Sequence, residues 1–248
     1  TRRQWARMGS DWDSSFATVA PRLAAILAAA QLGSARQGAA YVPEVLDVVA
    51  GGIHDPSWTP FLFPWTDAPA EEMPANYLRF YASTLTRTVD GDVSLELVVR
   101  RNGQVVGMQG MNGPDVAGTR RLETGSWLGL PFQGQGLGTR MRRMMCALAF
   151  DGLGLDAVTS SAWEDNAASR RVSEKVGYLE TGRGQAERRG VPTPEVYFEL
   201  RPRGFVRGDE PVRITGADEL RRFLGLGCGY PLFWGHYSTH YIGGKDNF

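Results

Sequence analysis

Three glycines, Gly134, Gly136 and Gly138, stand at alternate positions between an apolar run with strand character and a run with helical spacing. The backbone N–H groups at the start of a helix have no partners within the helix, and they lie at the positive end of its dipole. Glycine permits positive φ and lets a ligand approach the backbone closely. The junction therefore predicts an anion site, most naturally for phosphate.

Two common phosphate-binding patterns do not fit this junction. The Walker pattern requires Lys after its last glycine, whereas Gly138 is followed by Thr139 and Arg140. The dinucleotide pattern spaces its glycines as G-x-G-x-x-G, and the spacing here is G-x-G-x-G. The pattern Q-x-x-G-x-G does fit, with Gln133, Gly136 and Gly138. On these residues alone, a tight turn that binds nothing remains the alternative.

A second segment, EDNAASRRVSEKVGYLETG, supports the first. It resembles an N-x-x-S…K-x-G-[FY] pattern, whose places are filled by Asn166, Ser169, Lys175, Gly177 and Tyr178. With the glycine junction upstream, residues of about 45–205 resemble the Gcn5-related N-acetyltransferase (GNAT) superfamily, and within it the subfamily that includes ribosomal-protein N-terminal acetyltransferases. Residues 1–40 show a weak resemblance to a phage head-assembly protein.

The resemblance implies acetyl-coenzyme A (acetyl-CoA) as the cofactor and assigns residues to it. Backbone amides of the junction would bind the pyrophosphate, namely those of Gln133, Gly134, Gln135, Gly136, Leu137, Gly138 and Thr139. The preceding strand would pair with the pantetheine arm at Leu128, Gly129 and Leu130, and one of these N–H groups would donate to the oxyanion. Asn166 and Ser169 would face the pantetheine. The candidates for the 3′-phosphate are Arg140, Arg143, Arg170 and Arg171.

Direct acyl transfer to an amine needs a neutral nucleophile and a proton for the leaving thiolate. We expect Glu123 to be the base, with Glu164 and Asp165 as alternatives. The other interpretation of Glu123 is an ion pair with Arg120 or Arg121 on an exposed face. Ser169 is the first candidate for the acid and Tyr178 the second. The chain departs from the superfamily at Ser173, where many members carry a tyrosine general acid.

The predicted elements place these residues in a mixed sheet. Asn102-Gly103 between two β-rich runs predicts a hairpin, and the run that ends in GSWLGL adds a third strand. A helix over roughly Gln135–Phe150 follows, with Arg140, Arg142 and Arg143 away from its apolar stripe. The order β-β-β-α-β-α-β-β after N-terminal helices predicts an α/β (α+β) fold with a mixed, mostly antiparallel central sheet flanked by helices.

We expect three parts: a helical N-terminal extension (1–42), an acetyltransferase domain (43–207), and a short helix with an aromatic tail (208–248). The 27 basic and 27 acidic residues cancel, which argues against a broad nucleic-acid surface. No run of 18 apolar residues suggests a membrane span. Two cysteines suit a reducing cytoplasm, and we expect no metal.

The sequence thus predicts an N-acetyltransferase whose partners are acetyl-CoA and a primary amine, either a small molecule or a protein N-terminus. Assembly into a homodimer is left open. The alternative is a non-catalytic binding or structural module with the acetyltransferase fold, in a phage-derived or fused protein.

Overall fold

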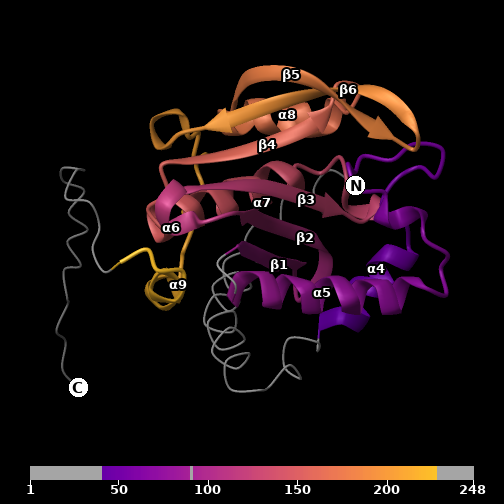
Figure 1. Cartoon of the computed structure of the whole chain (residues 1–248), viewed down its shortest axis with the longest axis horizontal. Coiled ribbons are helices and arrows are strands. Elements are labelled where there is room, and N and C mark those ends of the chain that lie inside the picture. The colour runs from indigo at the N-terminus through magenta and orange to yellow at the C-terminus, as the bar shows by residue number, and fades with distance from the viewer. Residues whose placement is uncertain (1–40, 90–91, 228–248) are drawn as a thin grey trace, which may run out of the picture.

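The computed structural model describes residues 41–89 and 92–227, in which six strands form one sheet (Figure 1). The strands are β1 (Val93–Arg101), β2 (Gln104–Gly113), β3 (Arg121–Leu128), β4 (Ala157–Trp163), β5 (Leu179–Arg188) and β6 (Val191–Leu200). The helices are α4 (Val42–Ala50), α5 (Met73–Val89), α6 (Val116–Thr119), α7 (Leu137–Ala147), α8 (Ala167–Val176) and α9 (Ala217–Phe223).

The strand order across the sheet is β1-β2-β3-β4-β6-β5, and only β3 and β4 run parallel. This confirms the predicted mixed, mostly antiparallel sheet. The β1–β2 hairpin also turns where the sequence predicts it. Asn102 and Gly103 have φ values of 49° and 78°, the left-handed conformation that a two-residue hairpin turn of type I′ requires at both positions.

Alternate residues of β1 and β2 face two different helical layers. Val98 and Met108 pack with α4 and with Tyr77 of α5, which lie along β1 and β2 in Figure 1. Val99 and Val106 face the other way and pack with residues of α7. Successive side chains of a strand point to opposite faces, so this edge of the sheet is covered on both sides. The layer that holds α7 also brings the glycine junction against β3.

The helix after the junction is shorter than the sequence predicts. We expected it over about Gln135–Phe150, whereas α7 begins at Leu137, after Gly136 in the left-handed conformation, and ends at Ala147. A π-helical turn, Leu148–Gly152, continues it and packs into the core. Helical spacing alone does not distinguish an α turn from a π turn.

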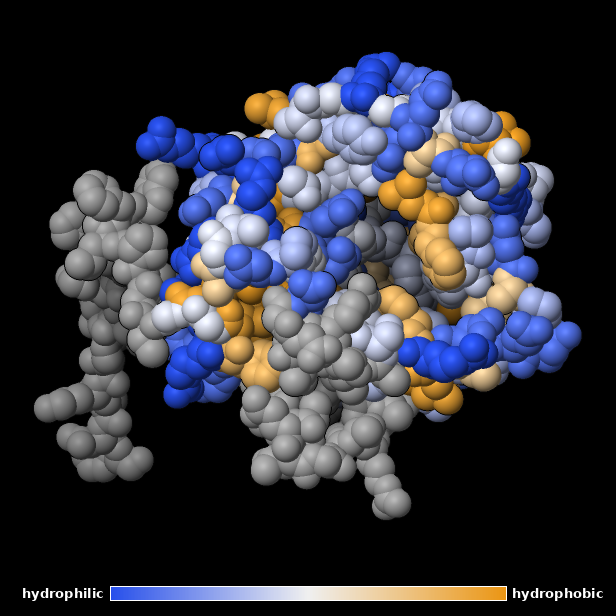
Figure 2. All heavy atoms as spheres, viewed as in Figure 1, coloured by the Kyte–Doolittle hydropathy of each residue, from blue (hydrophilic) through white to orange (hydrophobic). Residues whose placement is uncertain are grey.

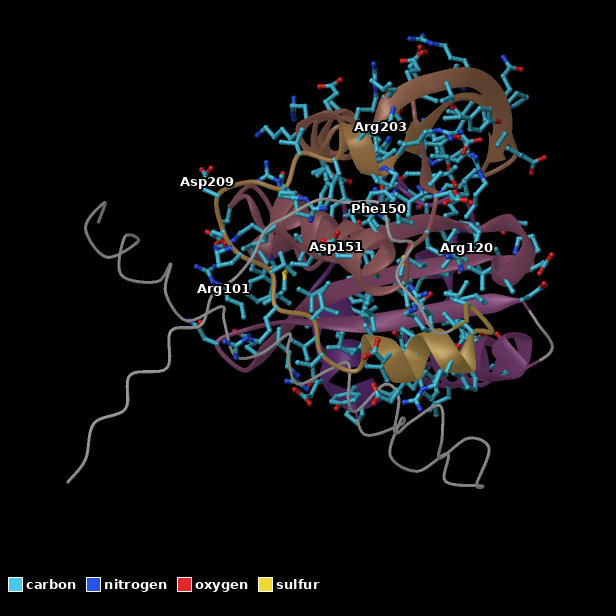
Figure 3. The ribbon with its side chains drawn as sticks, turned by 90° about the vertical axis from the view of Figure 1, so that its left-hand side faces the viewer. Arg101, Arg120, Phe150, Asp151, Arg203 and Asp209 are labelled. Atoms are coloured by element: carbon cyan, nitrogen blue, oxygen red, sulfur yellow. The ribbon has the colours of Figure 1, made fainter. Side chains whose placement is uncertain are left out.

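Helix α9 packs onto the main core rather than standing apart from it. Leu220 and Leu224 join the largest hydrophobic cluster of the described residues. Arg120, labelled above the gold helix α9 in Figure 3, donates to the carbonyls of Leu226 (3.3 Å) and Gly154 (3.0 Å). The expected domain boundaries stay predictions, because the N-terminal extension up to residue 40 and the aromatic tail from 228 on lie outside the described residues.

A glycine at the end of α8 gives a test of the packing. Gly177 has φ +99°, and a Cβ there would lie 2.0 Å from the carbonyl oxygen of Gly204. We expect Gly177→Ala to lower the free energy of unfolding by about 3 kcal/mol, since strain and collision add. Gly103→Ala is the control, because it has φ +78° with nothing within 4 Å, and should cost about 1–2 kcal/mol. Equal costs in chemical denaturation would contradict the collision.

Candidate active site

The parallel pair β3–β4 separates soon after it begins. The two strands pair only over Arg121–Glu123 and Ala157–Thr159. At the point of separation, side chains replace the ladder: the Thr124 hydroxyl donates to the Thr159 carbonyl (3.0 Å), and the Ser160 hydroxyl donates to the Thr124 carbonyl (3.1 Å). The facing edges of the two strands diverge beyond these bonds and form two walls of a cleft.

The cleft is a cavity of about 740 Å³ that joins most of the predicted site residues. Its walls are the diverging ends of β3 and β4, the glycine junction, the first turns of α7 and α8, and the loop that starts at Ile53. Figure 2 shows the molecule hollowed on the face seen there, with apolar side chains gathered at the edge of the hollow.

The glycine junction has the geometry of an anion site. Gly134 and Gly136 have φ values of +72° and +79°, and a Cβ on either would have no neighbour within 4 Å. No side chain caps the N-terminus of α7, so its first N–H groups are available to a ligand. Gly138 differs, because a Cβ there would lie 3.4 Å from Val172 of α8. It therefore also permits close packing of the two helices.

Gln133 ties the junction to its surroundings. Its side-chain amide donates to the carbonyls of Ile53 (2.7 Å) and Leu128 (2.8 Å), and its backbone N–H donates to Leu130 (3.2 Å). The neighbouring Gln135 side chain donates to the Pro131 carbonyl (2.7 Å). Gln133 thus holds the loop in place, and its own N–H is already engaged within the protein.

One backbone N–H of β3 remains as the candidate oxyanion donor. The N–H groups of Gly129 and Leu130 donate to the carbonyls of Val106 and Gly52, both at 3.0 Å. Successive N–H groups along a strand point to opposite sides, so the N–H of Leu128 points away from β2 and toward the cleft. The predicted trio therefore narrows to Leu128.

Helix α8 brings Asn166 and Ser169 to the cleft. Asn166 caps the helix, since its Oδ1 accepts from the backbone N–H of Ser169 at 3.0 Å. The Ser169 hydroxyl has no hydrogen-bond partner among the described residues, and both side chains line the cavity. Tyr178, the second candidate for the acid, is instead buried, with its hydroxyl 2.9 Å from the Thr124 hydroxyl. Ser173 is buried too.

The four arginine candidates for the 3′-phosphate differ in whether their side chains are already engaged within the protein. Arg140 forms an ion pair with Glu210, Arg143 donates to the Val206 carbonyl (3.1 Å), and Arg170 donates to the Glu164 carbonyl (3.1 Å). Arg171 is exposed, lines the cavity and forms no ion pair among the described residues. It is the candidate that the geometry favours.

Glu123 lies where a base could act. It is on the face of β3 opposite to Thr124 and lines the cavity. The Ser161 hydroxyl donates to its Oε1 at 3.4 Å. Partial desolvation by the cleft walls raises the pKa of the Glu123 carboxyl above its usual value, and the nearby Glu195 raises it further. The raised pKa strengthens the carboxylate as a proton acceptor.

The alternative bases are both held in ion pairs. Asp165 pairs with Arg188 at 2.7 Å and accepts from the Trp58 indole N–H at 3.2 Å; these hydrogen bonds keep its pKa below the usual range. Glu164 pairs with Arg183. Both carboxylates are thus engaged by arginine side chains, whereas Glu123 forms no ion pair among the described residues.

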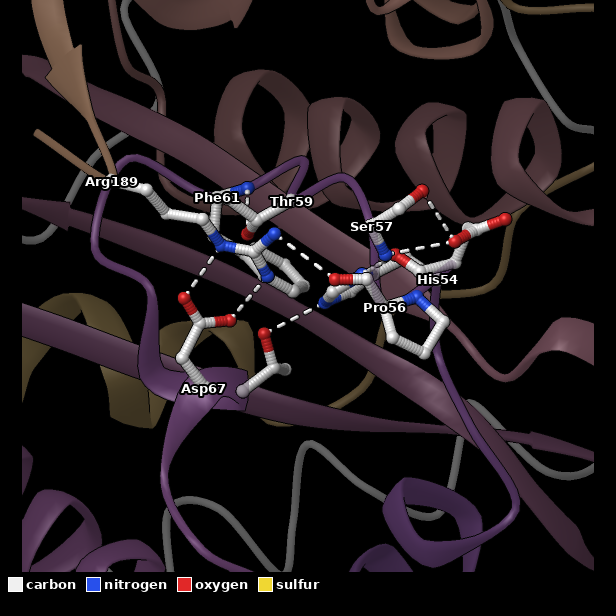
Figure 4. A network of polar contacts seen from close by, with 9 residues as sticks. His54, Pro56, Ser57, Thr59, Phe61, Asp67 and Arg189 are labelled. Carbon is white, nitrogen blue, oxygen red and sulfur yellow. Dashed lines mark hydrogen bonds and ion pairs between the residues drawn. The ribbon is translucent and has the colours of Figure 1, made fainter. Parts of the chain in front are cut away.

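The loop that begins at Ile53 forms one side of the cleft and is anchored to the β5–β6 turn (Figure 4). Arg189 in that turn grips the Asp67 carboxylate with two hydrogen bonds of 2.6 and 2.7 Å, and donates to the Pro56 carbonyl at 3.0 Å. Trp58 and Phe61 line the cavity, whereas Phe63 is 77% exposed. Part of this aromatic loop is therefore a wall of the site.

One prediction about α7 is wrong. The helical pattern placed Arg142 away from the apolar stripe, but the side chain is only 3% exposed. Its guanidinium turns inward beneath the separation of β3 and β4 and donates to the hydroxyls of Thr124, Ser126 and Ser160. These hydroxyls belong to β3 and β4, so the periodicity of α7 could not indicate this contact.

A comparison with known protein families agrees with this geometry. A family model described as "Acetyltransferase (GNAT) domain" matches residues 42–179, which is more than half of the chain. The chain belongs to the GNAT acetyltransferase family. The predicted family and fold are thereby confirmed, and the class of enzyme predicted from the sequence is the class of this family. The phage resemblance of residues 1–40 is not borne out, and these residues lie outside both the match and the described ranges.

Individual relatives are similar over parts of the chain. YdaF of Bacillus subtilis (strain 168), a protein assigned as a ribosomal N-acetyltransferase, is 33% identical over 84 residues, which is 34% of this chain and 45% of YdaF. The match therefore spans less than half of that relative. RimJ of Mycobacterium smegmatis, solved with CoA-disulfide, is 19% identical, with 68% of this chain and 78% of RimJ covered and a TM-score of 0.55.

RimL, a ribosomal L7/L12 α-N-protein acetyltransferase solved with coenzyme A, is 18% identical, with 68% of this chain and 90% of RimL covered and a TM-score of 0.54. At such identities these likenesses concern the fold. Among the described residues, no helix is both long and apolar enough to cross a membrane. In the same ranges, no three His, Cys, Asp or Glu side chains are grouped to hold a metal ion.

The junction gives the first ligand-binding prediction. We expect Gly136→Glu to abolish the binding of coenzyme A in calorimetry, because a side chain and a negative charge would enter the anion site. Gly190→Glu is the matched control. Gly190 has the same φ of +79° and equally open space, but it lies in the β5–β6 turn. If both variants bind coenzyme A as the wild type does, the junction is not the phosphate site.

Proposed function

We propose that the chain transfers an acetyl group from acetyl-CoA to a primary amine by direct attack in a ternary complex. The observation that carries the proposal is that the open glycine junction, the separated edges of β3 and β4, and Glu123 belong to one cavity. The junction offers uncapped N–H groups and open space at Gly134 and Gly136, which fits a pyrophosphate. The unpaired edge of β3 fits an extended amide-containing arm.

The thioester of the bound acetyl-CoA supplies the activated acyl carbon. Glu123 takes the proton that the attacking amine loses, and the N–H of Leu128 donates to the oxygen that becomes negative. Ser169, whose hydroxyl is free within the described residues, gives a proton to the departing sulfur. One C–N bond forms and one C–S bond breaks. Glu123 then releases its proton to solvent and Ser169 regains one from solvent, so that the net change moves one proton from nitrogen to sulfur.

The acceptor side supports an amine at the end of an accessible chain. Trp58 and Phe61 offer apolar walls, and Glu123 offers negative charge to an incoming ammonium group. We keep both acceptor classes, a protein N-terminus and a small-molecule amine, and the homodimer stays a prediction. Release of free coenzyme A should be measured with the full chain, acetyl-CoA, and a panel of both acceptor classes. Coenzyme A binding without turnover on any amine would instead support the non-catalytic module.

The role of Glu123 predicts a pH-dependent loss. Glu123→Gln should lower kcat/KM by about 10²–10⁴-fold at a pH below the pKa of the acceptor amine. The loss should shrink as the pH rises, because the amine then reaches its neutral form without help. In the wild type, the rate should fall as the pH falls through the raised pKa of Glu123, where the base becomes protonated. Glu219→Gln on α9 is the control, and a uniform loss across pH would exclude the role of base.

The position of Arg171 predicts that it contributes to the binding of coenzyme A but not of dephospho-coenzyme A. Arg171→Ala should weaken the binding of coenzyme A roughly tenfold, which is the typical effect of losing one hydrogen bond between charged groups. It should leave the binding of dephospho-coenzyme A unchanged, because that ligand lacks the 3′-phosphate. Equal weakening of both ligands in calorimetry would mean that Arg171 acts elsewhere on the donor.

A further inference from the structure

The buried guanidinium of Arg142 has no part in the chemistry described above. It lies under the point where β3 and β4 separate, is 3% exposed, and belongs to the lining of the cleft. Its Nη1 donates to the hydroxyls of Thr124 and Ser160, both at 3.2 Å, and its Nη2 donates to the Ser126 hydroxyl at 3.1 Å. Its Cζ lies 5.7 Å from the centre of the Tyr178 ring.

This environment leaves the charge of Arg142 uncompensated. A guanidinium has five N–H donors, and the described residues accept three of them, all with neutral hydroxyls. The Nε donor is buried and has no partner among those residues. No described Asp or Glu forms an ion pair with Arg142, and Glu123 lies on the opposite face of β3. Buried charges in proteins are normally paired, and an arginine fork is suited to a carboxylate.

The position of Arg142 indicates which carboxylate would reach it. If the N–H of Leu128 binds the thioester oxygen, the acyl chain enters the closing angle between β3 and β4, where Ser126 and Thr124 meet the guanidinium. Two residues along a strand span about 7 Å. A four-carbon acyl group that ends in a carboxylate, together with one hydrogen bond from that carboxylate to the guanidinium, is long enough to cover this span. The apolar end of an acetyl group stops short of it.

We propose that the cleft also accepts dicarboxylic acyl-CoA donors of the succinyl type, with Arg142 as the residue that binds the distal carboxylate. This inference rests on the proposed function and names a second class of donor for the same site. The transfer is unchanged: the amine nitrogen bonds to the thioester carbon, the C–S bond breaks, and the proton from nitrogen ends on sulfur. The distal carboxylate takes no part and remains an anion in the product amide.

The test compares donors on the wild-type full chain. With one amine acceptor, kcat/KM should be at least about tenfold higher for succinyl-CoA than for butyryl-CoA, which has a chain of the same carbon number and no charge. Malonyl-CoA and glutaryl-CoA, whose acyl chains are one carbon shorter and one carbon longer, test the distance to the guanidinium. Both should give a lower kcat/KM than succinyl-CoA. Equal use of succinyl-CoA and butyryl-CoA would overturn the proposal without any variant.

Variants then connect the preference to Arg142. Arg142→Met should lower kcat/KM for succinyl-CoA at least about tenfold more than it lowers kcat/KM for acetyl-CoA, so the ratio of the two donors is the readout. Arg142→Lys keeps the charge but loses the planar fork of donors. Its kcat/KM for succinyl-CoA should lie between the values of the wild type and of Arg142→Met. Arg222→Met, an exposed arginine of α9, is the control and should behave as the wild type. A loss that is equal for all donors would show that Arg142 only supports the fold.

Binding without an acceptor separates this proposal from the proposed function. Calorimetry with free coenzyme A reports on the groups that bind the phosphates and the pantetheine arm, whereas the ratio of the dissociation constants of succinyl-CoA and butyryl-CoA reports on Arg142. If coenzyme A binds and acetyl-CoA is used but the ratio is near one, the donor class proposed here is wrong and the proposed function stands. If no donor is used in transfer, the proposed function fails, and the ratio still decides whether Arg142 binds a carboxylate.

Discussion

The early end of the β3–β4 ladder is the constraint on which the site depends. Three residue pairs hold the two strands, and then hydroxyl-to-carbonyl bonds of Thr124 and Ser160 take over. Backbone groups beyond that point face a cleft rather than a neighbouring strand, and such groups are costly to bury without partners. The cleft therefore presents an edge that a ligand can complete. The glycine junction follows β3 after one short turn, Leu130–Phe132, so the chain itself places the junction near the open edge.

Local features of the site were predictable because short-range chemistry determines them. Asn102-Gly103 turns the hairpin since both positions need positive φ, and Gly134 and Gly136 need it at the junction for the same reason. The alternation of strands and helices was sufficient for the mixed sheet. Asn166 was recognised from its resemblance to the N-x-x-S pattern, and the structure gives a local reason for that spacing, because its side chain accepts from the N–H of Ser169 three residues on.

Contacts between distant segments were not predictable in this way. Arg142 was placed away from the apolar stripe, and its burial was missed because helical periodicity records only its own helix, whereas its partners lie on β3 and β4. Asp165 looked like a free carboxylate until the β5–β6 hairpin brought Arg188 against it. The trio of possible oxyanion donors narrowed to Leu128 only when the partners of Gly129 and Leu130 were known. Each case depends on tertiary packing that no local pattern encodes.

The hydrogen bonds of Gln133 affect how substitutions on the two sides of the cleft should be compared. One amide holds both the end of β3, at Leu128, and the loop that begins at Ile53. A shift of either segment therefore changes the hydrogen bond to the other. Substitutions on opposite sides of the cleft are therefore not independent, and their effects need double-mutant cycles through Gln133 before they are added.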